Sequence, residues 1–378
     1  MAIEYLKKAP PRQEAIDKTT SEIVGRILAD IKANGREAVE RYARDLDGWH
    51  GSVVLTEADF AKATQALSQG VRDDIDFAHA RVRDFAIRQR ESLLEFEVEL
   101  IDGLIAGQKL IPVNTAGCYV PGGRYAHAAS AIMSICTAKV AGVPNIVATS
   151  PGHRNDGVNP AILHTMKLCG ADTVLALGGV QGIAAMAYGL YGPKAADIIV
   201  GPGNSYVAEA KRTLFGLIGI DVVAGPTESA IIADEMADVD LIAFDLAGQA
   251  EHGPDSPVWL FTSSRELGLK LIDLMPSVIA SLPEPARSAA SAAWRDYGQV
   301  ILADTREELV EISDQYAPEH LQLFAKDLDW WLARLTNYGS LFLGEETTVA
   351  YGDKCAGPNH ILPTRGAARY SGGLSVGK

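Results

Sequence analysis

From Gly117 onward, short runs of β-branched residues alternate with windows of helical periodicity. The first series of runs is GCYV, NIVAT, DTVLAL, DIIV and IDVVA, which ends at Ala224. Strands that alternate with helices pair in parallel through right-handed crossovers, so this series predicts an open α/β sheet. A second series, SAIIAD, PVWLFT, QVILAD and SLFL, predicts another α/β unit directly after the first.

The first hundred residues have a different pattern, in which charged residues surround apolar ones at helical spacing. Ile23, Ile27 and Ile31 follow this spacing, and a second helical stretch runs from about Ala61 to Phe85. The segment LLEFEVEL fits either a strand or the end of a helix. We therefore expect a helical N-terminal segment ahead of the two sheets.

Composition and charge exclude several classes of protein. Asp and Glu number 48 against 34 Lys and Arg, a net charge of −14, whereas a non-specific nucleic-acid binder needs a basic surface. No run of 18 apolar residues could cross a membrane, and the start, MAIEYLKKAPPR, lacks the apolar core of a signal peptide. The four cysteines form no C-x-x-C pair, which favours reduced thiols. We expect a soluble, cytoplasmic protein with no nucleic-acid or membrane partner.

Glycine turns replace the usual dinucleotide fingerprint. G-x-G-x-x-G is absent from the sequence, but VPGG, GGVQG and GPGN each stand at the end of a predicted strand. Each turn precedes a helix, whose N-terminus can face an anion at the carboxyl edge of the sheet. The turns either bind a ligand there or serve backbone geometry alone.

Two short polar motifs have residue types suited to metal binding or to proton transfer. Gln249 and His252 are three residues apart at the end of a helical window, so both could reach one metal. The alternative is a helix C-terminus that favours a histidine because of the helix dipole. The adjacent Glu319 and His320 form a pair suited to proton transfer near neutral pH.

A third polar group lies near the end of the sequence. Asp353 and His360 bracket a loop in which Gly357 and Pro358 predict a turn that holds both side chains toward one point. Taken together, the three groups supply His, Asp and an amide oxygen for a cation such as zinc, and a separate acid and base.

These residues and the motifs around them resemble the histidinol dehydrogenase family. The resemblance runs from about Ala15 to the last residue, and its most specific stretches are CYVPGGR, KVAGV, GPGNSYVAEAKR, IDVVAGPTE, DLAGQAEH, APEHLQ and GPNHILPTRGAARYSGGLSV. It implies an NAD-dependent, zinc-containing homodimer. Such an enzyme oxidises a primary alcohol through an aldehyde to a carboxylate and consumes two NAD.

The resemblance also implies two incomplete Rossmann-like domains with parallel sheets, one inserted in the other. Residues 119–226 would form the inserted, NAD-binding domain, and residues 21–118 with 227–371 would form the domain that carries the catalytic and metal residues. Residues 1–20 would be an N-terminal segment, and residues 372–378 would start a C-terminal tail.

The resemblance further implies a role for each residue that matches a family motif. The implied cofactor contacts are Tyr119, Gln181 and Asn204, the implied zinc ligands are Gln249, His252 and Asp353, and the implied substrate contacts include Thr227 and His360. Glu319 and His320 correspond to the catalytic pair. His320 would remove the hydroxyl proton as hydride leaves, and Glu319 would then activate the water that hydrates the aldehyde.

Some residues differ from the usual pattern of histidinol enzymes. His127 and Lys354, with Arg124 and Arg365, predict a basic pocket for an anionic substrate; alternatively, Lys354 and Arg365 point to solvent. The stretches LIPVN, YAHAAS, GPTE and YGDKCAGPNH are more similar to the sulfopropanediol 3-dehydrogenase branch. That branch oxidises (R)-2,3-dihydroxypropane-1-sulfonate to (R)-sulfolactate. The alternatives are L-histidinol as the substrate and a non-catalytic NAD-binding paralogue.

Members of the family continue past LSV into a helical tail. A glutamate and a histidine of that tail complete the zinc site of the partner subunit, whereas the sequence here stops at Lys378. Either the sequence is cut short before the tail, or water or another residue supplies the fourth zinc ligand.

Overall fold

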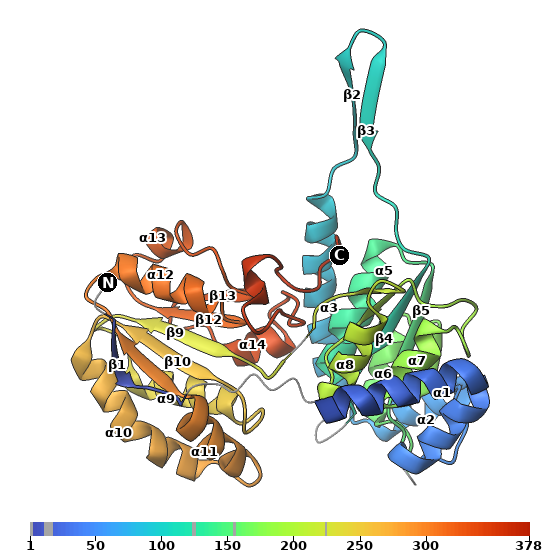
Figure 1. The fold of residues 1–378 in the computed structure, drawn as a ribbon, viewed down its shortest axis with the longest axis horizontal. Coiled ribbons are helices and arrows are strands. Elements are labelled where there is room, and N and C mark those ends of the chain that lie inside the picture. The colour runs from blue at the N-terminus through green and yellow to red at the C-terminus, as the bar shows by residue number, and fades with distance from the viewer. Residues whose placement is uncertain (1–2, 11–17, 123–125, 154–155, 224) are drawn as a thin grey trace. The chain divides into compact units, whose positions relative to one another are not determined.

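The chain divides into two compact units. The computed structural model describes residues 3–10, 18–122, 126–153, 156–223 and 225–378. Unit 1 comprises residues 1–15, 224–352 and 362–373, and unit 2 comprises residues 16–223, 353–361 and 374–378. The α/β class predicted from the sequence is confirmed, because each unit is built on its own sheet (Figure 1).

Unit 2 is built on a parallel sheet with the strand order β6-β5-β4-β7-β8. The strands are β4 (Thr115–Tyr119), β5 (Asn145–Ser150), β6 (Thr173–Ala176), β7 (Ile198–Val200) and β8 (Gly219–Ile220). Numbered along the chain, this order is 3-2-1-4-5, the doubly wound arrangement of a Rossmann-like sheet. The first series of predicted strands therefore forms one sheet, as expected.

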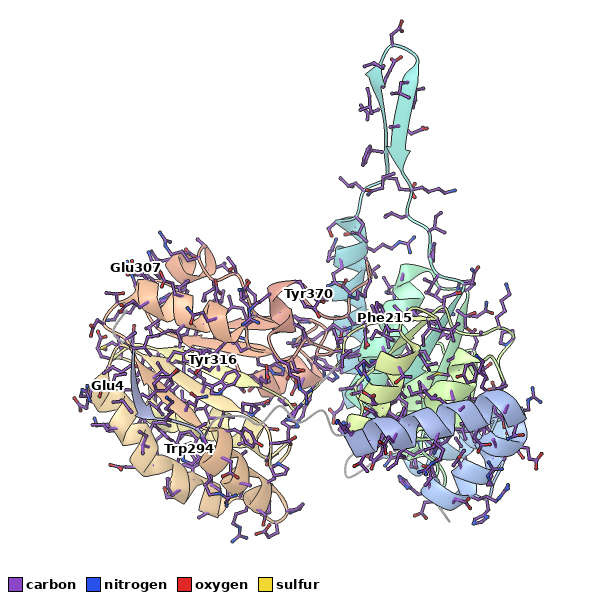
Figure 2. All side chains as sticks on the ribbon, in the orientation of Figure 1. Glu4, Phe215, Trp294, Glu307, Tyr316 and Tyr370 are labelled. Atoms are coloured by element: carbon purple, nitrogen blue, oxygen red, sulfur yellow. The ribbon has the colours of Figure 1, made fainter. Side chains whose placement is uncertain are left out.

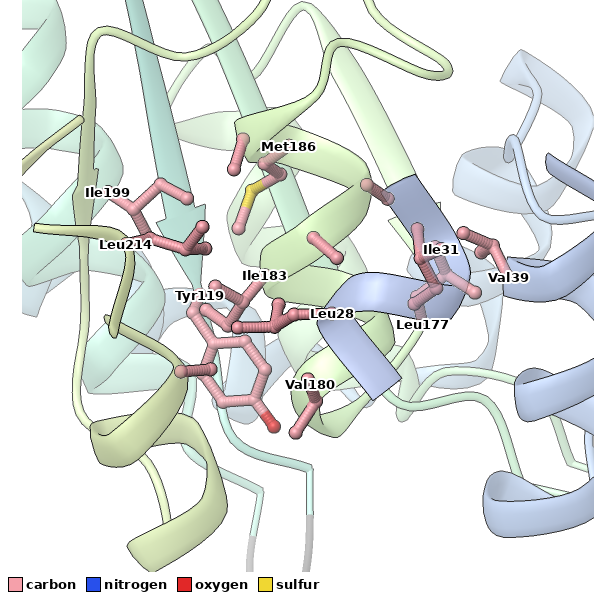
Figure 3. Packing of buried hydrophobic residues seen from close by; sticks show 14 of the residues in the cluster. Leu28, Ile31, Val39, Tyr119, Leu177, Val180, Ile183, Met186, Ile199 and Leu214 are labelled. Carbon is pink, nitrogen blue, oxygen red and sulfur yellow. The ribbon is translucent and has the colours of Figure 1, made fainter. Parts of the chain in front are cut away.

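Helices of unit 2 precede and connect these strands. They are α1 (Lys18–Tyr42), the π-helical turn η1 (Ala43–Asp47), α2 (Glu57–Ala66), α3 (Gln69–Glu91), α4 (Ala128–Ala131), η2 (Ile132–Cys136), α5 (Thr137–Ala141), α6 (Pro160–Leu168), α7 (Gly179–Ala187) and α8 (Ser205–Leu214). Leu28 and Ile31 of α1 pack in one apolar cluster with Ile183 of α7 and the Tyr119 ring (Figure 3).

The N-terminal helices belong to unit 2, which corrects the expected domain division. Residues 21–118 were expected to share a domain with residues 227–371, yet α1 packs on α7 and α8, and α3 packs on η2 and α5. The apolar stripe of α1 is the physical reason, since Val24 and Ile31 are fully buried in the core of unit 2. Burying such a stripe stabilises a helix more than its own propensity does.

The segment LLEFEVEL leads into an antiparallel hairpin of β2 (Phe96–Ile101) and β3 (Leu104–Gln108). The hairpin extends from the end of α3, and its side chains project on both sides of the ribbon (Figures 1 and 2). Phe96 and Val98 are exposed and lie on one face of β2, because alternate residues of a strand share a face and the register shifts only after Glu99. An exposed apolar face of this kind marks an interaction surface.

Unit 1 repeats the doubly wound order in a second sheet, β1-β11-β10-β9-β12-β13. The strands are β1 (Glu4–Lys7), β9 (Ser229–Ala233), β10 (Val258–Thr262), β11 (Gln299–Leu302), β12 (His320–Phe324) and β13 (Ser340–Leu343). All neighbours are parallel except β1, which pairs antiparallel with β11 at the edge. The strands β1 and β12 were not predicted from the sequence.

Helices cover both faces of the sheet in unit 1. One face packs against α9 (Val239–Ala250), α10 (Arg265–Ser281) and α11 (Ala286–Tyr297), and the other against α12 (Arg306–Tyr316) and α13 (Leu328–Leu332). The last elements along the chain are α14 (Val349–Lys354) and η3 (Ala367–Arg369).

The cysteines and the helices can be compared with what the sequence predicts about disulfides and membrane spans. All four cysteines are free, as expected. Burial raises the pKa of the Cys118 thiol to about 12, so this thiol stays protonated and is not a nucleophile. Across the described ranges, no helix is both long and apolar enough to cross a bilayer.

Candidate active site

The predicted catalytic pair lies at the amino end of β12, between β9 and the edge strand β13 in the sheet of unit 1. His320 aligns with Ser229 of β9 on one side and with Ser340 of β13 on the other. Glu319 is 7% exposed and His320 is 3% exposed. Glu319 is the last residue before β12, and His320 is its first residue. A carboxyl group and an imidazole are therefore adjacent in the chain, and both are buried.

Glu228, which the sequence analysis did not single out, holds both members of the pair. Its backbone N–H donates to Oε2 of Glu319 at 3.0 Å, and its carbonyl oxygen accepts the backbone N–H of His320 at 3.1 Å. The same carbonyl oxygen lies 3.3 Å from His320 Nδ1. Because a carbonyl only accepts, Nδ1 carries the proton and Nε2 is the basic nitrogen. The contact thus sets the tautomer that a general base needs.

The segment around Arg365 in turn fixes Glu228. The backbone N–H of Arg365 lies 3.1 Å from both carboxylate oxygens of Glu228, and Gly225 donates its N–H to Thr364 Oγ1 at 2.6 Å. The Arg365 residue is exposed and uses its backbone here. Thr227, an expected substrate contact, is half-buried next to Glu228. Within the GPTE motif, the sequence analysis named Thr227, whereas the residue that contacts the predicted catalytic pair is Glu228.

Two expected zinc ligands lie at the C-terminal end of α9. Gln249 is in the last turn of this helix, and the backbone N–H of His252 donates to the Gln249 carbonyl oxygen at 3.2 Å. A helix that connects two parallel strands runs back along the sheet, so its C-terminus lies at the amino edge. His320 begins β12 at that same edge.

The side chain of Gln249 fits the role of a metal ligand. Gln249 is 6% exposed, and its Oε1 has no hydrogen-bond partner among the described residues. A buried acceptor without a donor calls for a bound group, and an amide oxygen beside an imidazole suits a cation such as zinc. No three His, Cys, Asp or Glu side chains gather as a metal site within the described ranges; the expected set relies on an amide.

Asp353 and His360 belong to unit 2. Asp353 lies in the last turn of α14, directly before the expected loop. His360 Nδ1 lies 2.7 Å from the backbone oxygen of Asp353, and His360 Nε2 lies 3.2 Å from Ser130 Oγ. The His360 ring thus contacts the backbone of Asp353, and the expected convergence of the two side chains stays a prediction.

The residues expected to form a basic pocket have different surroundings. His127 is half-buried and is the N-cap residue of α4, the helix that carries Ser130 and thus approaches His360. Lys354 is exposed at the end of α14. Arg124 lies outside the described residues.

The three expected cofactor contacts lie at the carboxyl edge of the sheet in unit 2. Tyr119 ends β4, and its hydroxyl accepts the N–H of Gly179 at 3.1 Å. Burial raises the pKa of this hydroxyl to about 12, so it remains a neutral phenol. Gln181 is buried in the first turn of α7, and the exposed Asn204 caps α8.

The GPGN turn after β7 is pressed against Tyr119. Gly201 has a φ of +117°, and a Cβ added to it would lie 2.0 Å from the Tyr119 carbonyl oxygen. Behind the turn, Lys211 and Asp221 form a buried ion pair. Lys211 Nζ donates to the Gly201 carbonyl oxygen at 2.9 Å, and Asp221 accepts the Gly201 N–H at 2.7 Å. These contacts hold the turn in place at the edge of the sheet.

Gly201→Ala is expected to weaken NAD binding by at least about tenfold and to lower the melting temperature. The substitution strains the backbone by about 1–3 kcal/mol and also forces the turn away from Tyr119. Gly216→Ala is the matched control, because Gly216 has a φ of +98° with nothing within 4 Å of an added Cβ. Titration of both variants with NAD, alongside thermal unfolding, checks this. Equal effects at the two glycines would contradict the contact with Tyr119.

Comparison with known proteins gives one consistent family. The model of the histidinol dehydrogenase family matches residues 10–378. The chain is 55% identical over 378 residues to a sulfopropanediol 3-dehydrogenase of Ruegeria pomeroyi, which covers 100% of this chain and 87% of that protein. It is 56% identical over 379 residues to a histidinol dehydrogenase homolog of Pelagibacter ubique, with 100% and 89% covered.

The fold agrees with these sequence matches. A crystal structure of histidinol dehydrogenase from Elizabethkingia anophelis matches with a TM-score of 0.90 at 32% identity, over 97% of this chain and 84% of that one. The resemblance found in the motifs is therefore confirmed along the chain. The protein belongs to the histidinol dehydrogenase family, whose members are NAD-dependent dehydrogenases that oxidise an alcohol by four electrons.

Proposed function

We propose that the protein is a sulfopropanediol 3-dehydrogenase, which oxidises (R)-2,3-dihydroxypropane-1-sulfonate to (R)-sulfolactate. The observation that carries this proposal is the 55% identity, over the whole chain, to the Ruegeria pomeroyi protein of that name. His127, half-buried at the N-cap of α4, supports it, because an imidazole N–H group suits an anionic sulfonate better than the cationic amine of histidinol.

The expected substrate contacts extend this proposal. Thr227, His127 and His360 would contact the substrate, with Lys354 and Arg124 supplying positive charge. Arg and Lys side chains bind sulfonate oxygens by charge-assisted hydrogen bonds. Of these residues, His127, Thr227 and His360 are half-buried, and Lys354 is exposed.

The catalytic pair would supply the proton transfers of two oxidations. His320 would accept the hydroxyl proton at Nε2 in each oxidation, while the Glu228 carbonyl holds Nδ1–H. Glu319 would activate the water that adds to the aldehyde between the two oxidations. Bound NAD would accept a hydride each time, so one alcohol, one water and two NAD⁺ give one carboxylate, two NADH and three protons.

NAD and zinc would be bound by two separate sets of residues. Tyr119, Gln181 and Asn204 would form the NAD site at the carboxyl edge of the sheet in unit 2. Gln249, His252 and Asp353 would hold zinc. Bound zinc would orient and polarise the substrate oxygen, and the orphaned Oε1 of Gln249 supports its role as a ligand.

The protein would act as a homodimer, with the β2–β3 hairpin in the interface. An isolated two-stranded hairpin is marginally stable in water, yet Phe96 and Val98, which share one face of β2, are 53% and 46% exposed. A second copy of the chain would cover this apolar face and stabilise the hairpin. The molar mass of the purified protein in solution, measured by light scattering, tests this.

We expect two NADH per molecule of limiting (R)-2,3-dihydroxypropane-1-sulfonate when zinc is present. The measurement follows NADH by absorbance to the end point and runs L-histidinol in parallel. Two NADH from the sulfonate would establish both the substrate and the four-electron oxidation. Two NADH from histidinol alone would move the function to histidinol oxidation, and NAD binding without turnover of either would indicate a non-catalytic paralogue.

A further inference from the structure

An aspartate far away in the sequence occupies the turn at the N-terminus of α7. Asp47, the last residue of η1, accepts the N–H of Gly178 at 2.9 Å and the side-chain N–H of Gln181 at 2.9 Å, both at Oδ2. Burial raises the pKa of the Asp47 carboxyl, and the bonds from Gly178 and Gln181 oppose that rise. The carboxylate is thus a built part of the turn.

This carboxylate changes which part of a dinucleotide the GGVQG turn can accept. A helix N-terminus normally favours an anion through its unpaired N–H groups. Here the Gly178 N–H is used by Asp47, and the Gly179 N–H is used by the Tyr119 hydroxyl. A pyrophosphate at this turn would be repelled by the Asp47 carboxylate. It would also find the N–H groups of Gly178 and Gly179 already bonded to other acceptors. The turn therefore suits a neutral group that donates hydrogen bonds, such as a ribose hydroxyl.

The position of Asp47 in the fold matches that of a ribose-binding carboxylate. In a sheet of order 3-2-1-4-5, an acid at the end of the second strand accepts the ribose 2′-hydroxyl of NAD. The second strand here is β5, and Pro151 follows it directly. A Cβ added to Gly178 would lie 2.8 Å from Asp47 Oδ1 and 2.8 Å from Pro151 Cβ. Asp47 Oδ1 is therefore beside the end of β5, although η1 supplies it.

A second acceptor at the same turn lacks a donor. Gln181 is 1% exposed, and its Oε1 has no hydrogen-bond partner among the described residues. Its side-chain N–H is fixed on Asp47, so Oε1 is held in a set direction. Buried acceptors without a partner are rare in native proteins. A ligand that brings hydroxyl groups to this turn would satisfy it.

We propose that Asp47, together with Gln181 Oε1, receives the hydroxyls of the adenosine ribose and thereby selects NAD over NADP. A 2′-phosphate at this place would meet the Asp47 carboxylate, and like charges repel. Asp47 is then a specificity-determining residue of the cofactor site. This inference rests on the proposed NAD site at the carboxyl edge of the sheet in unit 2.

The test compares NAD with NADP in the wild type, Asp47→Asn and Asp47→Ser. The asparagine keeps an oxygen that can accept the Gly178 N–H, and the serine makes room for a phosphate. We expect kcat/KM for NAD to fall about 10- to 100-fold, while kcat/KM for NADP holds or rises, so the preference for NAD falls at least about tenfold. Asp45→Asn is the matched control, because Asp45 is an exposed aspartate of the same η1 turn.

The ratio of kcat/KM for NAD to kcat/KM for NADP separates cofactor selection from a structural role of Asp47. If Asp47 only supports the turn, both cofactors lose activity equally and the ratio stays at the wild-type value, which overturns the proposal. A wild-type enzyme that prefers NADP overturns it as well. The assay uses whichever alcohol the wild type oxidises, so a wrong substrate leaves this test intact. Failure of the wild type to bind NAD in a calorimetric titration would instead refute the proposed NAD site.

Discussion

His320→Gln is expected to lower kcat for the alcohol by about 10²- to 10⁴-fold, while NAD binding stays within about twofold of the wild type. In the folded chain, the Glu228 carbonyl oxygen lies 3.3 Å from Nδ1, which leaves Nε2 as the base. Glutamine has a similar length and can keep a polar contact with Glu228, but its amide cannot take a proton from a hydroxyl group. Steady-state rates with saturating alcohol and NAD measure the loss.

The control for this prediction is His164→Gln. His164 is a half-buried histidine of α6 whose Nδ1 lies 2.9 Å from Thr64 Oγ1, so it tests the effect of losing an imidazole outside the site. Its kcat should match the wild type. Thermal unfolding of both variants shows whether each remains folded. A folded His320→Gln variant with near wild-type kcat would show that another group is the base.

The parallel sheets could be predicted because their strands are buried on both faces. Such strands are apolar along their whole length, as SAIIA and VWLFT are, and need no knowledge of their neighbours. β12 was missed although His320 and Gln322 alternate with leucines, which is the pattern of a half-buried strand. Both are in fact buried, at 3% and 0% exposed. The missed strand carries His320, a member of the predicted catalytic pair.

The supporting residues of the site could not be predicted for a different reason. Glu228 reaches Glu319 across 91 positions of the sequence, and Asp47 reaches Gly178 across 131. Neither contact leaves a local pattern, since each depends on how separate helices and strands pack. The resemblance to the family named the residues within motifs, and Asp47 is in none of them. Asp47 reaches the turn because the N-terminal helices pack within unit 2.

Glu319→Gln is expected to convert the four-electron oxidation into a two-electron one. The glutamine keeps an oxygen that can accept the Glu228 N–H, which Glu319 Oε2 accepts at 3.0 Å, so the position of His320 should be preserved. An amide cannot remove a proton from water, and the second oxidation needs a hydrated aldehyde. We expect this second step to slow by at least about 10²-fold and the first step to continue at a similar rate. The NADH formed per alcohol should fall from two to one.

The aldehyde itself gives the decisive readout for Glu319. Trapping with hydroxylamine should recover nearly one aldehyde per alcohol consumed by the variant, and little from the wild type. Glu307→Gln is the control, because Glu307 is an exposed glutamate in the first turn of α12 (Figure 2). Two NADH per alcohol from Glu319→Gln would assign water activation to another group. Loss of both oxidations together would mean that Glu319 acts through the placement of His320, and the 3.7 Å between Oε2 and His320 Nδ1 is the contact that would transmit it.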